Sequence, residues 1–141
     1  MEKLWSKTKI GKMELPHRLS MAPMTRSRAQ EDGTPGEEAS LYYAQRASMG
    51  LIITEGVQPS DDGQGYLWSP WIYTEKHIEG WRKVTDAVHK ADGYMYIQLM
   101  HAGRMSHPDN TPSSTTRSTF PHRARCRNVY CYRHAGYPRT T

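Results

Sequence analysis

Three short apolar runs punctuate the first hundred residues, and each predicts a buried β-strand. Residues 19–23 read Leu-Ser-Met-Ala-Pro, residues 51–54 read Leu-Ile-Ile-Thr, and residues 94–99 read Tyr-Met-Tyr-Ile-Gln-Leu. These runs are shorter than the 10 or so residues of a typical helix, and β-branched and aromatic side chains favour strands. Gly and Pro within residues 10–18 indicate a hairpin or turn before the first strand.

The segments between these runs have the periodicity of amphipathic helices. Apolar residues recur every three or four positions in residues 37–48 and again in residues 75–91, and such spacing gives a helix one apolar face. The positions are Ala39, Tyr42, Tyr43 and Ala47 in the first segment, and Ile78, Trp81, Val84 and Val88 in the second. Strand, helix, strand, helix, strand is a βαβαβ order, which predicts an α/β fold with a parallel sheet and right-handed crossovers.

Polar and small residues follow each predicted strand. They are found in residues 22–25, 54–56 and 98–101. In parallel α/β folds ligands bind at the carboxyl ends of the strands. The pattern alone therefore places a candidate site at that edge of the sheet.

Composition changes sharply near residue 111. No Asp or Glu follows Asp109, whereas six arginines do: Arg117, Arg123, Arg125, Arg127, Arg133 and Arg139. Those six exceed the whole net charge of +5, so the rest of the chain is close to neutral. We therefore divide the chain into residues 1–111 and a basic tail, residues 112–141, and expect the tail to be disordered. The neutral body makes nucleic acid an unlikely partner of the chain as a whole.

No stretch approaches the roughly 20 apolar residues that span a bilayer, and the first residues lack the apolar core of a signal peptide. The sequence therefore predicts a cytoplasmic protein that does not enter a membrane.

Six stretches in order resemble the old yellow enzyme family. They lie at residues 21–29, 42–47, 53–56, 63–66, 80–89 and 98–104, and include Met-Ala-Pro-Met-Thr-Arg, Ile-Thr-Glu-Gly and Gln-Leu-Met-His-Ala-Gly-Arg. The resemblance implies the N-terminal part of an FMN-binding (β/α)₈ TIM barrel. It also implies transfer of a hydride from NADH or NADPH through FMN to the activated C=C bond of an α,β-unsaturated carbonyl. A closed barrel typically needs about 250 residues, so a chain of 141 residues is expected to be an incomplete barrel.

Carried over by position, the resemblance assigns cofactor and substrate contacts. Pro23, Met24 and Thr25 would lie along the flavin, with the Thr25 hydroxyl donating toward flavin O4. Gly56 would let the backbone approach the ring, and the Gln98 amide would match the donor and acceptor edge of the flavin pyrimidine. On the substrate side, the resemblance places Tyr66 and Met100; many relatives carry Trp at the Met100 position.

Plainer interpretations stand beside these. Met24 could be core filler, and without the family the Thr25 hydroxyl would be a turn residue that bonds its own backbone. His101 and His107 could be taken for a metal pair, but no third ligand is placed by any motif, so we expect no metal and ordinary hydrogen bonding there.

Residues 112–141 have two possible interpretations. In the shifted reading frame, codons for residues 120–126 and 127–140 can encode a Pro- and Ala-rich loop that resembles the family's continuation. We therefore favour a frameshift near Pro112. The alternative is a small non-enzymatic protein whose basic tail binds nucleic acid or a protein partner. Cys126 and Cys131 do not match standard zinc-site spacing.

By the resemblance, the substrate clamp, the proton donor and the phosphate-binding residues lie beyond residue 141. We accordingly expect the isolated chain to fold poorly, to hold FMN weakly or not at all, and to be inactive.

Overall fold

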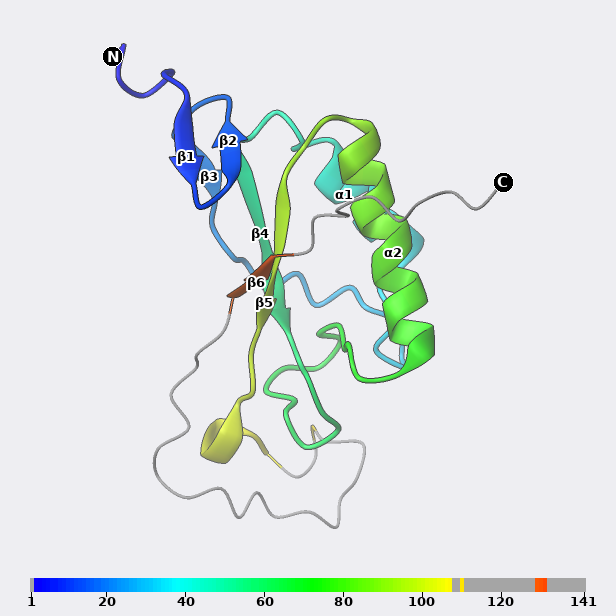
Figure 1. Cartoon of the computed structure of the whole chain (residues 1–141). Coiled ribbons are helices and arrows are strands. Elements are labelled where there is room, and N and C mark those ends of the chain that lie inside the picture. The colour runs from blue at the N-terminus through cyan, green and yellow to red at the C-terminus, as the bar shows by residue number, and fades with distance from the viewer. Residues whose placement is uncertain (1, 108–109, 111–128, 132–141) are drawn as a thin grey trace.

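A computed structural model describes residues 2–107, 110 and 129–131. Its centre is a four-stranded sheet in the order β3-β4-β5-β6 (Figure 1). The strands are β3 (Ser20–Met21), β4 (Leu51–Val57), β5 (Met95–Leu99) and β6 (Val129–Cys131). β3, β4 and β5 are parallel. This confirms the predicted βαβαβ order.

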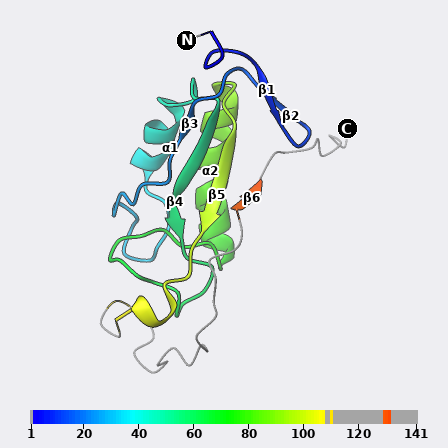
Figure 2. The same ribbon diagram turned by 90° about the vertical axis from the view of Figure 1, so that its left-hand side faces the viewer.

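Two helices, α1 (Glu37–Ala44) and α2 (Glu75–Lys90), lie on the same side of the sheet (Figures 1 and 2). Their apolar positions form the main core with β3, β4 and β5. The buried members are Met21, Tyr43, Ile52, Val57, Trp81, Val84, Val88, Met95 and Ile97. Burying side chains of this size contributes roughly 1.5–3 kcal/mol each before the entropy of ordering is subtracted.

The apolar stripe predicted on α2 was wrong at Ile78. Ile78 is 38% exposed, and the buried residue in that turn is His77, at 3%. His77 is buried because it closes the start of the helix. Its backbone N–H donates to the hydroxyl of the N-cap Thr74, and its ring Nδ1 accepts from the backbone N–H of Thr74.

A hairpin of β1 (Thr8–Ile10) and β2 (Met13–Leu15) packs near the start of the parallel strands (Figure 1). Met13 and Leu15 form a second cluster with Leu51, and Tyr94 and Tyr96 pack against it. The hairpin predicted at residues 10–18 is thus present but begins and ends earlier in the chain. It covers the amino ends of the strands and leaves their carboxyl ends for the site.

Two element boundaries differ from the sequence prediction. The first helix ends at Ala44 rather than Ser48, and β4 continues through Glu55, Gly56 and Val57 instead of ending at Thr54. β4 and β5 shift register between Ile53 and Gly56, which indicates a bulge at the point where the polar residues begin.

β6 lies in the segment that we expected to be disordered. It pairs antiparallel with β5, with Val129 opposite Gln98. The remainder of that segment, and the frameshift and zinc interpretations of it, lie outside the described residues. A 3₁₀ helix, η1 (Gly103–Met105), follows β5.

Candidate functional site at the carboxyl ends of the strands

The parallel strands bring two of the predicted site residues directly together. Gly56 on β4 is the register partner of Gln98 on β5, and Val57 is the partner of Leu99. The Gln98 side chain is half-buried. Within the described residues, its amide group has no hydrogen-bonding partner, so both its donor and its acceptor are available at this edge.

Pro23, Met24 and Thr25 follow β3 in an extended and exposed segment; Met24 is 45% exposed. The core-filler interpretation of Met24 is therefore wrong. The segment is tied to β4 one residue later, where the Arg26 backbone N–H donates to Glu55 Oε2 over 2.7 Å. This hydrogen bond joins the segment that contains Thr25 to β4, the strand that contains Gly56.

Glu55 also lies at this edge of the sheet, and no sequence motif predicts a role for it. It is only 6% exposed, and its backbone N–H donates to the hydroxyl of Tyr43 on α1 over 3.1 Å. Burial raises the pKa of the Glu55 carboxyl, and the backbone N–H groups of Arg26 and Ser27 oppose that rise. The sequence does contain a sign of this role: Glu55 follows directly after the apolar run Leu51–Thr54. A carboxylate is rarely buried in such a strand without a defined partner.

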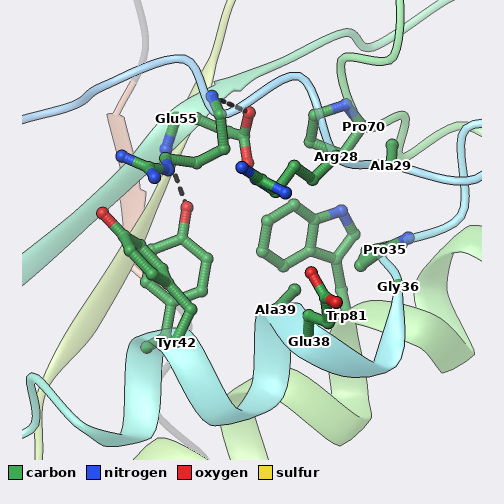
Figure 3. A pocket seen from close by; sticks show the side chains of 12 residues that line it. Arg28, Ala29, Pro35, Gly36, Glu38, Ala39, Tyr42, Glu55, Pro70 and Trp81 are labelled. Atoms are coloured by element: carbon green, nitrogen blue, oxygen red, sulfur yellow. Dashed lines mark hydrogen bonds between the residues drawn. The ribbon is translucent and has the colours of Figure 1, made fainter.

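A cavity of about 180 Å³ lies beside Glu55, between α1, Trp81 and the segment that follows Thr25 (Figure 3). Its ionisable side chains are Arg26, Arg28, Glu38, Tyr42, Tyr43 and Glu55. The guanidinium groups of Arg26 and Arg46 lie 4.5 and 3.8 Å from the centre of the Tyr42 ring. Tyr42 therefore packs against two cations, which adds to the helix-packing role that we expected of it.

Tyr66 and Met100, the two residues predicted to line the substrate pocket, differ from each other in exposure and contacts. Tyr66 is 59% exposed in the loop after β4. Met100 lies against Gly56, since a Cβ added at Gly56 would be 2.5 Å from the Met100 methyl carbon. The space over Gly56 that we assigned to a ligand is thus taken by the end of a flexible side chain.

His101 makes ordinary hydrogen bonds, as expected. Its Nε2 lies 3.2 Å from Asp62 Oδ1, and its Nδ1 accepts from the Gly103 backbone N–H. Among residues 2–107, 110 and 129–131, no group of three or more His, Cys, Asp or Glu side chains could hold a metal ion. Over the same residues, no helix is long and apolar enough to span a bilayer.

Comparison with known proteins identifies the family. The sequence model of the NADH:flavin oxidoreductase / NADH oxidase family matches residues 3–135. The chain belongs to this family. The match extends past Arg104, where the last stretch on which we based the resemblance ends, and past Thr111, where we placed the boundary of the tail.

Individual members agree with this assignment. The chain is 44% identical over 110 residues to chanoclavine-I aldehyde reductase of Penicillium roqueforti, covering 77% of this chain and 30% of that protein. It is 42% identical over 106 residues to 12-oxophytodienoate reductase 1 of Oryza sativa subsp. japonica, covering 74% and 28%.

A solved structure of morphinone reductase in complex with tetrahydroNAD superimposes with a TM-score of 0.76 at 42% identity, over 79% of this chain and 31% of that one. The chain therefore spans about 30% of the length of its relatives. The fold class, an N-terminal part of the old yellow enzyme TIM barrel, is confirmed.

The groups carried by Thr25 and Gln98, which follow β3 and lie on β5 respectively, match in type the edge of a flavin. A hydroxyl donor from Thr25 and a donor-acceptor amide from Gln98 suit the alternating N–H and C=O groups of the flavin pyrimidine. The Met100 methyl group is the nearest obstacle at Gly56 among the described residues. It is the far end of a flexible side chain, so it can move aside at small cost.

Proposed function

We propose that this chain supplies the first strands of the FMN site in an enzyme that transfers a hydride from NADH or NADPH to an activated C=C bond. The observation that carries the proposal is the pairing of Gly56 with Gln98 at the carboxyl ends of parallel strands, in a chain of this family. FMN, when bound, accepts the hydride and passes it to the alkene. The chain's own residues bind and orient the ring.

The roles of the individual residues follow from their chemistry. Pro23 and Met24 would line the ring, and the Thr25 hydroxyl would donate to flavin O4. A donor at O4 stabilises negative charge on the ring and so tunes its potential. Gln98 would fix the pyrimidine edge by accepting from one of its N–H groups and donating to a carbonyl.

The substrate is a small molecule, and we infer an α,β-unsaturated carbonyl compound. Relatives are named as reductases of chanoclavine-I aldehyde, 12-oxophytodienoate and morphinone. Tyr66 and Met100 would face it from the loop after β4 and the end of β5. We infer a cytosolic location, where NADH and NADPH are available to the reaction.

The direct test of cofactor binding is a titration of the 141-residue chain with FMN, followed by flavin fluorescence. We expect weak saturable quenching that Gln98→Leu abolishes. Gln30→Leu is the matched control, because Gln30 is exposed and is not among the residues assigned to the flavin. Equal binding by the two variants would contradict the assigned role of Gln98.

The test of activity is a chimera in which residues 1–107 replace the corresponding segment of morphinone reductase. We expect the chimera to bind FMN and to reduce an activated alkene such as cyclohexenone, whereas the isolated 141-residue chain shows no turnover. A chimera that folds but stays colourless would contradict the proposal.

A further inference from the structure

We propose that Glu55 is a positioning residue that fixes the segment carrying Thr25, and thereby sets where that segment meets the flavin. This inference rests on the proposed function, since it takes Thr25 as a flavin contact. It concerns a residue that touches no predicted ligand and acts only through the backbone of its neighbours.

Glu55 connects three elements through two hydrogen bonds. Its carboxylate accepts from the Arg26 backbone N–H over 2.7 Å, and Arg26 directly follows Thr25. Its own backbone N–H, on β4, donates to the Tyr43 hydroxyl on α1 over 3.1 Å. The segment after β3 is therefore held to the sheet and the helix at one point.

The side chain of Glu55 lies on the helix side of the sheet. It lines the cavity with Trp81 and Tyr42 (Figure 3), whereas the next residue, Gly56, faces Met100. Adjacent residues of a strand point to opposite faces. Glu55 thus supports the site from behind, while Gly56 and Gln98 form its front.

The segment needs such a support, because its backbone is strained there. Ser27 has a φ of 52°, in the left-handed region, which costs about 1 kcal/mol for a residue other than Gly. Packing on one side of the segment is incomplete, since the cavity of about 180 Å³ lies against Arg26 and Arg28. A charge-assisted hydrogen bond to a buried carboxylate is strong enough to hold this conformation.

The experiment compares three variants of the full 141-residue chain: Glu55→Leu, Glu55→Gln and Val84→Ala. Glu55→Leu removes the acceptor, and Glu55→Gln keeps a carbonyl oxygen that can accept from Arg26. Val84 is fully buried between the helices and the sheet, so Val84→Ala destabilises the core without touching the segment. The readouts are hydrogen exchange at the Arg26 amide and FMN affinity, both measured under conditions where each variant is folded.

We expect Glu55→Leu to lower both Arg26 protection and FMN affinity by about tenfold or more, which is the effect of losing a hydrogen bond to a charged group. Glu55→Gln should restore most of both. Val84→Ala should leave FMN affinity unchanged.

Unchanged Arg26 protection in Glu55→Leu would overturn the proposal, as would lost protection with unchanged FMN affinity. Equal loss of affinity in Val84→Ala would also overturn it, because the effect would then be general destabilisation. If neither the wild-type chain nor the morphinone reductase chimera binds FMN, the proposed function fails. The exchange at Arg26 then still decides whether Glu55 holds the segment.

Discussion

The Gln98 backbone N–H donates to the Thr54 hydroxyl over 3.1 Å, so a side chain of β4 replaces a ladder partner of β5 at the register shift. The same hydroxyl donates to the Glu55 carbonyl over 2.8 Å. One buried Thr therefore stabilises the bulge that lets Glu55 face the helices and Gly56 face Gln98.

Replacing this hydroxyl is expected to destabilise the sheet. Thr54→Val keeps the shape but leaves the Gln98 N–H without an acceptor in a site from which water is excluded, at a cost of about 1–3 kcal/mol. Urea unfolding followed by tryptophan fluorescence measures the loss. Thr54→Ser retains the hydroxyl and is expected to lose less; similar losses in both variants would show that the methyl group, and not the hydrogen bond, matters.

Stability should fall on mild acidification because of His77. The Nδ1 of His77 accepts from the Thr74 N–H, so Nε2 carries the proton and donates to the Asp32 carbonyl over 2.9 Å. A second proton, on Nδ1, would remove the acceptor of the Thr74 N–H and place two N–H groups against each other. Burial, aided by Lys76, holds the pKa of His77 below its ordinary 6.5, although the backbone carbonyl and charge of Asp32 oppose this.

Because the folded-state pKa of His77 is lowered, the free energy of unfolding decreases as the pH falls. The stabilisation from neutral His77 is complete above pH 6.5 and is lost as the pH falls through 6.5 toward the folded-state pKa. The urea midpoint should therefore drop between pH 7.5 and 5.5. His77→Gln keeps a side chain suited to the capping box and should flatten the dependence. An equal drop in this variant would assign the effect to another group.

The order of the elements could be predicted from the sequence, because periodicity reports which faces are buried. The end of β4 could not, because Glu55 and Gly56 resemble loop residues, and a strand contains them only when a tertiary partner such as the Arg26 N–H satisfies the carboxylate. Ile78 and His77 show the same limit. The capping of α2 by Thr74 turns a polar residue inward, and helical spacing alone contains no sign of this.

For the candidate site as well, the location could be predicted from the sequence but the positions of individual side chains could not. Strand ends and motifs indicated Gly56 and Gln98 as candidate flavin contacts, and the structure pairs them. The side chain of Met100 over Gly56 depends on a rotamer that only packing sets.

Gly33 is expected to tolerate no side chain. Its φ is +75°, and a Cβ there would lie 2.0 Å from a ring carbon of Trp71. Gly33→Ala should cost about 1–2 kcal/mol for the backbone and roughly 1–3 more for the displaced ring. Gly11→Ala is the matched control, since Gly11 has a φ of +57° with no atom within 4 Å of an added Cβ. Equal losses in urea unfolding would contradict the contact with Trp71.

The coding DNA should contain a second meaningful frame after the Pro112 codon. The absence of acidic residues and the six arginines after Asp109 are what a shifted frame can produce, whereas the family match through residue 135 is to the present frame. We expect the alternative frame across residues 113–141 to encode a Pro- and Ala-rich segment of the family type. Sequencing the gene over this stretch measures it directly. Stop codons or unrelated sequence in that frame would leave the basic tail as a native extension, and salt-dependent RNA binding would then be its test.

Shortening Met100 is expected to strengthen FMN binding. The Met100 methyl occupies the space that a flavin would need over Gly56, so binding must first displace it. Losing the packing of that side-chain end costs on the order of 1 kcal/mol, which corresponds to about fivefold in affinity. Met100→Ala removes this cost in advance, and the FMN titration measures the gain. Met105→Ala is the control, because Met105 is 80% exposed in η1. A weaker affinity in Met100→Ala would show instead that the thioether contacts the bound ring and belongs to the cofactor site.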